Sequence, residues 1–449
     1  MAEVAAPSGG IDPRSGFCAA TRTFHSIRAA RALPPESLPT TAAAYAFSLL
    51  SSPLPDRPAL VDAATGIAIS YPSFLAAVRS LAGGLWSTLG LRPGDVALVV
   101  APSRLDVPVL HFALMSIGAV VSPANPASTA EEYAHQVGLS RPVVAFAAPE
   151  VAAKLPAHVR CIVLGSDAYK RLSSAGAAAA PPPVAVKQSD TAAVLYSSGT
   201  TGRVKAVAIT HRNLIALICA HAENREKVAA EATEAGEEPP PAAVTLLPLP
   251  LFHVFGFMMV LRSVSMGETA VLMERFDFVA ALRAIERYRV TLLPAAPPLL
   301  VALIKSEEAR RRDISSLLVI GVGGAPLGRE VAERFAAVFP DVQIVQVKHQ
   351  IPCRMQNYTE SLACIADCLF LIYRIHVCTI PFIITGLRFD GIIWLRFIDG
   401  RAGGVLGLRF GREAGVALAG EDRRSVHRRG ARAGPARRAL GPGPDRHER

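Results

Sequence analysis

The sequence predicts an α/β fold in which helices cover parallel sheets. Within the first 350 residues, short apolar runs rich in β-branched residues alternate with longer amphipathic stretches, as expected for buried strands and their covering helices. The chain has 449 residues, of which 51% are hydrophobic and 19% charged, so it can bury a large core and does not resemble a disordered polypeptide. Seven cysteines in a chain of this length do not make the dense disulfide framework of a small secreted protein.

Strands and helices are expected in alternation along this region. Each expected strand is a short and mostly apolar run, and each expected helix repeats apolar residues at intervals of three or four positions. The expected strands are Val96–Val100, Gly118–Ser122, Val143–Ala147, Cys161–Leu164, Val244–Pro248, Ala270–Leu272 and Val290–Pro294. The expected helices are Pro72–Leu89, Leu105–Ile117, Val279–Tyr288 and Arg329–Phe339. Two polar segments interrupt the pattern: Ser173–Pro183 is expected to be an Ala/Pro linker, and Ala229–Pro241 a solvated insertion.

The excess positive charge is concentrated near the C-terminus. The chain carries 47 Lys and Arg against 37 Asp and Glu, and the segment from Arg401 to Arg449 alone holds 12 Arg and 5 acidic residues. A basic tail can bind nucleic acid, but this one has no aromatic residue beyond Phe410 on which bases could stack. We therefore expect no nucleic-acid partner. Because the excess charge is concentrated in this segment, we expect the chain before Arg401 to be close to neutral.

Cysteine spacing and hydropathy argue against a metal centre and a membrane span. Only Cys364 and Cys368 are close enough to resemble a zinc-ligand pair, and no second pair accompanies them, so free thiols are expected. The apolar stretch Cys368–Leu387 contains Arg374 and His376 near its middle, and a charge at mid-bilayer costs about 2.5–3.5 kcal/mol. We expect no stable membrane insertion, and the N-terminus lacks the basic start and apolar run of a secretory signal.

The most informative segment runs from Leu195 to Lys205 and reads L-Y-S-S-G-T-T-G-R-V-K. It follows an apolar strand, Ala192–Leu195, and precedes an amphipathic stretch, Arg212–Glu223. Its glycines allow a tight turn and a close approach to a ligand, its hydroxyl groups add donors, and its lysine supplies a compact charge for phosphate oxygens. These features predict an anion-binding loop. Its candidate ligands are Ser197, Ser198, Gly199, Thr200, Thr201, Gly202 and Lys205.

Two other interpretations of this loop fit less well. The P-loop of nucleotide hydrolases has the form G-x-x-x-x-G-K-[ST], whereas Gly199 and Gly202 are three positions apart and Lys205 follows three positions later. A polar loop without a ligand is the default for Gly, Ser and Thr alone. The uninterrupted run S-S-G-T-T-G with a lysine after it disfavours that default.

Four motifs together resemble the acyl-adenylate-forming ligases and, within them, the plant 4-coumarate-CoA ligases and their 4-coumarate-CoA ligase-like relatives. Tyr196–Lys205 is similar to the phosphate-binding signature of the family, and Pro248–Gly256 resembles its His-containing turn at the acyl pocket. Pro294–Leu303 resembles its Pro-Pro helix start, and Gly323–Gly328 resembles its substrate-wall glycines. The resemblance covers most of residues 11–346 and implies a large N-terminal domain of two helix-covered, mostly parallel sheets.

The resemblance implies a two-step acid–thiol ligation. A carboxylate attacks the α-phosphorus of Mg-ATP to give acyl-AMP and pyrophosphate, and the thiol of coenzyme A then displaces AMP. The loop residues and Lys205 would hold the leaving phosphates, and His253 would close the acyl pocket, so Lys205 and His253 are the candidate catalytic residues. A core histidine satisfied by backbone groups is the alternative for His253.

Other binding roles follow from the same resemblance. The residues that would bind the acyl adenylate are His253, Phe255, Met259, Gly323 and Gly324. Arg275 matches a basic position used for a coenzyme A phosphate, although an exposed arginine is usually only a solvated charge. The sequence assigns no ligand to magnesium and gives no indication of oligomeric state. The acid could be a hydroxycinnamate, a fatty acid or an oxylipin-type precursor, because one or two side chains shift such preferences by only about 1–3 kcal/mol.

The sequence departs from the family after Gln346. Val347-Lys-His-Gln stands where a Gly-Tyr-Gly-[Met/Leu]-Thr-Glu motif is expected, and no lysine follows Lys348, so the late catalytic lysine of the family has no counterpart. We expect residues 1–346 to form an incomplete AMP-binding domain. We expect residues 347–449 to be a disordered, non-family tail, translated from a retained intron and then from a shifted reading frame.

Two functions are therefore expected from the sequence. The first is an ATP-dependent acid–thiol ligase that uses ATP, Mg²⁺ and coenzyme A. The second is a catalytically dead, truncated relative that binds at most a nucleotide or an acyl ligand. The cytoplasm or the peroxisome is the expected compartment, although the sequence ends in His447-Glu-Arg449 and not in a Ser-Lys-Leu type peroxisomal signal.

Overall fold

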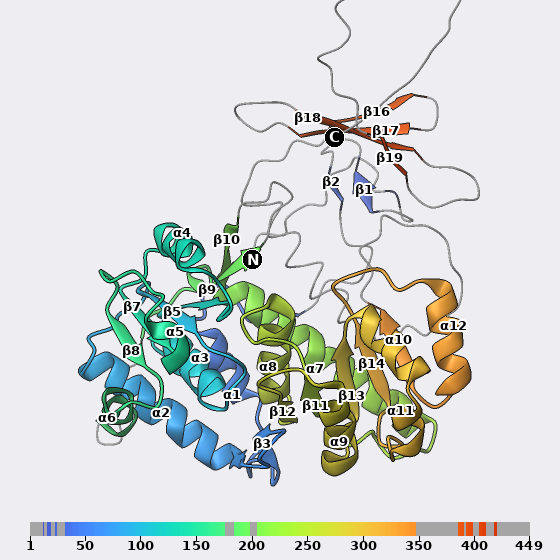
Figure 1. Cartoon of the computed structure of the whole chain (residues 1–449), viewed down its shortest axis with the longest axis horizontal. Coiled ribbons are helices and arrows are strands. Elements are labelled where there is room, and N and C mark those ends of the chain that lie inside the picture. The colour runs from blue at the N-terminus through green and yellow to red at the C-terminus, as the bar shows by residue number, and fades with distance from the viewer. Residues whose placement is uncertain are drawn as a thin grey trace, which may run out of the picture. The chain divides into compact units, whose positions relative to one another are not determined.

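The computed structural model describes residue 12, residues 16–18, 23–24, 32–175, 184–197 and 204–346, and the backbone of four later strands. The chain divides into two compact units. The larger unit is Ser26–Thr379, and the smaller unit combines Met1–His25 with Ile380–Arg449. The larger unit holds all the described helices and both large sheets (Figure 1).

The first large sheet has six strands in the order β10-β9-β6-β5-β7-β8. Its strands are β5 (Val96–Val100), β6 (Val120–Ala124), β7 (Val144–Ala147), β8 (Cys161–Val163), β9 (Thr191–Ser197) and β10 (Lys205–Thr210). All neighbouring pairs are parallel except β9 and β10, which are antiparallel. Five helices accompany the strands in sequence: α2 (Tyr71–Ser87), α3 (Asp106–Ser116), α4 (Ala130–Ser140), α5 (Pro149–Ala152) and α6 (Asp167–Ala175).

The second large sheet has seven strands in the order β15-β14-β13-β11-β12-β3-β4. Its strands are β3 (Pro58–Asp62), β4 (Ala68–Ser70), β11 (Val244–Leu247), β12 (Thr269–Leu272), β13 (Leu292–Ala295), β14 (Val319–Val322) and β15 (Gln343–Gln346). Only β3 and β4 are antiparallel. The remaining helices are α1 (Ala42–Ser48), α7 (His211–Glu234), α8 (Val254–Ser265), α9 (Phe278–Tyr288), α10 (Pro297–Lys305), α11 (Glu307–Arg311) and α12 (Arg329–Val338).

The second sheet is buried on both faces, because side chains that alternate along its strands enter two different cores. Leu247 and Leu272 belong to a core that also contains residues of the first sheet, such as Leu98. Leu246 and Val271, one position earlier on the same strands, belong to a second core that includes side chains of α9, α10 and α12. Continuous apolar strands are the expected consequence of burial on both faces.

One helix, α8, lies within the core that both sheets share. It contacts α1 and α7 as well as β11 and β12. Ten of its twelve residues are buried, so it exposes almost none of its surface to solvent. A helix that is buried on all sides has to be apolar all round, and the run Phe255 to Leu261 meets that requirement.

Most expected elements are confirmed, with shifts at their ends. The strand Val96–Val100 is confirmed to the residue, whereas the strand expected at Gly118 begins at Val120, because Gly118 has a left-handed φ of 72° and belongs to the preceding turn. The solvated insertion Ala229–Pro241 is largely exposed, but its first six residues continue α7 to Glu234. Ser173–Ala175 of the expected linker are the last turn of α6, and residues 176–183 lie outside the described residues.

The smaller unit contains short antiparallel strands. β1 (Phe17–Cys18) pairs with β2 (Thr23–Phe24). The strands β16 (Thr385–Phe389), β17 (Ile392–Phe397), β18 (Gly404–Arg409) and β19 (Ala417–Ala419) form a sheet in that order. The other residues of the 347–449 region lie outside the described residues, so its expected disorder stays a prediction, and the cysteine pair Cys364/Cys368 lies there as well. No helix among the described residues is long and apolar enough to cross a membrane.

The crossing of α2 and α6 predicts a cost for one added methyl group. A Cβ on Gly84 would overlap the backbone carbonyl oxygen of Leu172, which cannot swing aside like the end of a side chain. Gly84→Ala should therefore lower the free energy of unfolding by about 1–3 kcal/mol, as overpacking does. Gly138, on the exposed face of α4, has open space around its Cβ position. Gly138→Ala should therefore raise the free energy of unfolding by about 0.5–1 kcal/mol. Equal effects of the two changes in urea unfolding would contradict the close approach.

A buried histidine predicts how stability depends on pH. His111 on α3 is 4% exposed, packs its ring against Phe257 of α8, and has a pKa lowered by burial to about 3. The unfolded chain protonates this ring near its ordinary pKa of about 6.5 and the folded chain does not, so stability is lost as pH falls below that value. His111→Leu should reduce the pH dependence of the unfolding free energy between pH 6 and 4 by about 1.4 kcal/mol per pH unit. Parallel pH profiles for the two proteins in urea titrations would exclude this role.

Candidate active site

The predicted anion-binding loop connects two paired strands, β9 and β10. Ser197, the last residue of β9, lies opposite Lys205, the first residue of β10, in the antiparallel register. The sequence alone did not show that Lys205 opens a strand. Since β9 runs parallel to β6, the loop leaves the first sheet at the carboxyl ends of its parallel strands, where α/β proteins bind ligands. The loop residues Ser198, Gly199, Thr200, Thr201 and Gly202 lie outside the described residues.

A chain of hydroxyl groups supports the end of β9. The Tyr196 hydroxyl donates to Ser140 Oγ at 2.8 Å, and Ser140 Oγ donates in turn to the Gln136 carbonyl at 2.9 Å. With its own proton used in this way, the Tyr196 oxygen accepts from Ser122 Oγ, which is 2.8 Å away. Burial raises the pKa of Tyr196, so the phenol stays protonated and keeps this direction of donation. These hydrogen bonds therefore connect β9 to β6 and to α4.

A residue of α4 also contacts the C-terminal end of the loop. His135 Nε2 lies 2.9 Å from the backbone carbonyl oxygen of Val204, directly before β10. The Lys205 side chain is exposed, and no hydrogen bond or ion pair joins it to the side chain of another described residue.

The predicted histidine turn begins α8. His253 is the N-cap residue, and its Nδ1 accepts a hydrogen bond of 3.3 Å from the Phe255 backbone N–H. A ring nitrogen that accepts is unprotonated, so in the neutral ring the proton is on Nε2. Partial desolvation lowers the pKa of His253, which favours this neutral form. The alternative of a core histidine satisfied by backbone groups is half right: the ring accepts from a backbone N–H, but the residue as a whole is exposed and does not lie in the core.

The histidine turn is joined to the first sheet. The Leu251 backbone N–H donates to Ser103 Oγ at 3.3 Å, and both residues are buried. Ser103 follows the carboxyl end of β5, and Leu251 follows the carboxyl end of β11. Loops from the carboxyl ends of both sheets therefore meet. A Cβ at Gly256 would overlap the Pro250 carbonyl oxygen, so this tight turn requires glycine.

Two of the predicted acyl-binding positions touch each other. A Cβ added to Gly323 would lie 3.1 Å from Cε1 of Phe255, so the backbone after β14 runs along the Phe255 ring. Gly324 has a left-handed φ of 81° and open space at its Cβ position. Met259, one turn beyond Phe255 on α8, is 3% exposed and packs in the core. The Phe255 ring and the Gly323 backbone therefore form an apolar wall, which begins two residues after His253.

The remaining predicted positions have less structural context. Arg275 is exposed, follows the carboxyl end of β12, and has no hydrogen bond or ion pair with another described residue. Within the described part of the chain, no three His, Cys, Asp or Glu side chains come close enough to hold a metal ion. Sequence reasoning missed the supporting residues Ser103 and His135, because single polar residues give no signal of a contact so far along the chain.

The fold defines the class of the protein as a two-sheet α/β domain in which loops from the carboxyl ends of both sheets meet. The chain belongs to the AMP-binding enzyme family, which matches residues 51–347. Over 340 residues it is 84% identical to "4-coumarate--CoA ligase-like 5" of Oryza sativa subsp. japonica, and over 363 residues it is 69% identical to "4-coumarate--CoA ligase-like 6" of the same organism.

These matches cover only part of the relatives. The aligned regions are 75% and 77% of this chain but 63% and 61% of the two rice proteins. Among solved structures, the N-terminal domain of FACL13 from Mycobacterium tuberculosis matches with a TM-score of 0.55 at 22% identity, over 72% of this chain and 77% of that one. A luciferase-like enzyme from the mealworm Zophobas morio matches with a TM-score of 0.57 at 20% identity, over 70% and 73% of the two chains. At these identities the likeness shows the fold alone.

The N-cap position of His253 predicts how two substitutions of this residue change the stability of the protein. His253→Ala removes the acceptor for the Phe255 N–H and should lower the free energy of unfolding by about 0.5–2 kcal/mol, as the loss of a helix cap does. His253→Asn keeps a good cap residue and should stay within a few tenths of a kcal/mol of the parent. Chemical denaturation measures both values, and an equally destabilised His253→Asn protein would show that capping is not what the ring contributes.

Proposed function

We propose that this domain activates a carboxylic acid with ATP and transfers the acyl group to coenzyme A. The observation that carries the proposal is the contact between Leu251 and Ser103, because it joins the histidine turn of the second sheet to the carboxyl edge of the first. A phosphate-binding loop and an apolar acyl wall at one edge are what an adenylation reaction needs, since the two substrates must meet there.

In the first step a carboxylate oxygen forms a bond to the α-phosphorus of ATP, and the bond from that phosphorus to the bridging oxygen of pyrophosphate breaks. Negative charge grows on the departing pyrophosphate. Ser197 and Lys205 lie side by side at the root of the loop, so we assign them, with the loop residues Ser198–Gly202, to the β- and γ-phosphates. Fixed donors at the position where charge develops lower the barrier without reorganisation.

We assign His253 to the reacting carboxylate. A neutral imidazole with its proton on Nε2 donates a hydrogen bond without pairing permanently with a free carboxylate, as an imidazolium would. The Phe255 ring and the Gly323 backbone, which touch, would take the flat or extended apolar part of the acid, with Gly324 beside them and Met259 behind. A hydroxycinnamate, a fatty acid or an oxylipin-type acid fits such a wall.

In the second step the thiol sulfur of coenzyme A forms a bond to the acyl carbon and loses its proton to solvent, the bond from that carbon to the phosphate oxygen breaks, and AMP leaves. We assign Arg275, which follows β12 and has no ion-pair partner among the described residues, to a phosphate of coenzyme A. The rice relatives, whose names include "CoA ligase-like", support this step. Magnesium would neutralise phosphate charge in the first step. The described residues offer it no set of ligands, so we assign it none.

A second candidate is a relative that binds a nucleotide or an acyl ligand without turnover. The sequence after Gln346, where the residues of the family pattern are replaced, favours it. In this case residues 1–346 would keep the loop and the acyl wall but lack groups that complete the reaction.

Exchange of labelled pyrophosphate into ATP tests the proposal and separates the two candidates. With a panel of hydroxycinnamates and fatty acids, we expect exchange that requires an acid, and Lys205→Ala should reduce it by about 10²–10³-fold, as the loss of a preorganised donor does. Lys154→Ala, an exposed lysine after α5, is the matched control and should change it less than twofold. Acid-independent exchange, or equal rates for the two lysine variants, would contradict the assignment. Binding of ATP without any exchange would favour the second candidate.

A further inference from the structure

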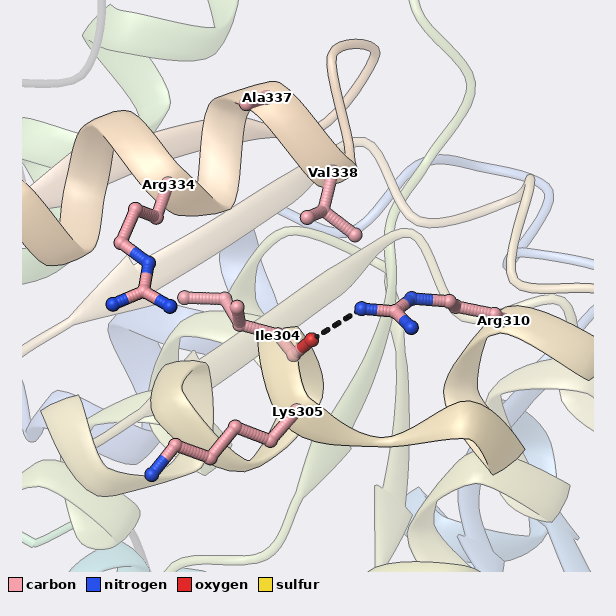
Figure 2. A pocket seen from close by; sticks show the side chains of 6 residues that line it. All are labelled: Ile304, Lys305, Arg310, Arg334, Ala337 and Val338. Atoms are coloured by element: carbon pink, nitrogen blue, oxygen red, sulfur yellow. Dashed lines mark hydrogen bonds between the residues drawn. The ribbon is translucent and has the colours of Figure 1, made fainter.

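A groove of about 420 Å³ lies among three helices that flank the second sheet (Figure 2). Its size is in the range of small-molecule sites. Figure 2 shows Arg334 extending from α12 toward α10, and Arg310 extending from α11 to the backbone of Ile304. The residues that line the groove are Ile304, Lys305, Arg310, Arg334, Ala337 and Val338.

The lining combines an apolar floor with cations and contains no carboxylate. Ile304, Ala337 and Val338 supply the apolar surface, and Ile304 itself is 9% exposed. The three charged side chains come from three different helices, α10, α11 and α12. A mostly apolar pocket with a small number of polar or charged groups is the usual form of a small-molecule site.

The ion pairs of this region leave two of the cations without an acidic partner. On α11, Arg311 pairs with Glu307 at 2.9 Å and Arg312, directly after the helix, pairs with Glu308 at 2.8 Å. Arg334 has a longer contact of 3.6 Å with Glu330 across an exposed turn of α12. Neither Lys305 nor Arg310 has an ion pair with a described residue.

Arg310 is held in place by a neutral group. Its Nη2 donates to the Ile304 carbonyl oxygen at 2.9 Å, which fixes the guanidinium at the edge of the apolar floor. A guanidinium has five N–H donors, so this bond leaves others for a ligand. A guanidinium presents its donors in a fixed fork that matches the two oxygens of a carboxylate.

The groove lies away from the proposed active site. Helix α10 begins after the carboxyl end of β13 and runs to Lys305, and α12 begins after the Gly323–Gly328 loop and runs to Val338. Both helices return toward the amino ends of the parallel strands. The C-terminal residues of α10 and α12, which line the groove, therefore lie toward the amino ends of the strands. The proposed active site lies at the carboxyl ends of the strands.

We propose that this groove binds a small amphiphilic carboxylate. The carboxylate contacts Arg310, and the apolar body of the ligand covers Ile304, Val338 and Ala337. A guanidinium without an acidic partner beside an apolar floor favours a ligand with both parts: an inorganic anion leaves the floor wet, and a neutral chain makes no use of the cation. Binding here does not depend on turnover at the proposed active site.

Calorimetric titration of the full chain with monomeric decanoate tests the proposal. We expect saturable binding of decanoate in the millimolar range or tighter, and at least tenfold weaker binding of decanol and of inorganic phosphate. Arg310→Gln should weaken decanoate binding at least tenfold. Ala337→Trp, which adds bulk at an exposed position of α12, should weaken it as well without lowering the melting temperature.

Arg311→Gln and Lys154→Gln are the matched controls, because both side chains are exposed and neither lines the groove. Both should bind decanoate as the parent does. Three results would overturn the proposal: no decanoate binding by the parent, the same affinity in the parent and the groove variants, or phosphate binding as tight as decanoate binding. The last result would identify an anion patch without an apolar component. Decanoate that binds only at the acyl wall would be weakened by Gly323→Leu and not by the groove variants.

Discussion

The burial of α8 between two sheets is the constraint on which the rest of the larger unit depends. Its C-terminal end is fixed by a bidentate ion pair, in which Arg262 donates to Glu268 at 2.6 and 2.9 Å in a largely buried setting. The hydroxyl of Tyr71 on α2 adds a bond of 2.6 Å to the Glu268 carbonyl oxygen. Because the C-terminal end of α8 is fixed and its middle is buried, its N-terminal end has little freedom to move. That end carries His253 and Phe255. The same packing that joins the sheets therefore positions the candidate acyl-binding groups.

The two halves of the candidate site are supported in different ways. The acyl wall rests on steric fit, in which Gly323 and Gly256 let backbone approach Phe255 and Pro250 closely. The phosphate loop rests on hydrogen bonds, through the hydroxyl chain at Tyr196 and the contact of His135 with Val204 at its two limbs.

Much of this could be predicted from sequence, and the failures have identifiable causes. Buried strands such as Val96–Val100 are evident because both faces are apolar. The strand Lys205–Thr210 was missed because it lies at an edge, has three exposed residues, and forms only by pairing with β9. The candidate site residues were predicted from their motifs, and their roles stay predictions. The contacts that hold them, Leu251 to Ser103 and His135 to Val204, join positions 148 and 69 residues apart, and local patterns carry no information about such pairs.

The most direct test of a shared site at the joined edges of the two sheets is a crystal structure of the chain with a non-hydrolysable acyl-adenylate analogue. The account predicts one bound molecule, with its acyl group against Phe255 and Gly323 and its phosphate mimic between His253 and the loop that begins at Ser197. The contact of Leu251 with Ser103 should persist in that complex. An analogue bound to only one sheet, or with its acyl group away from the Phe255 ring, would contradict the account.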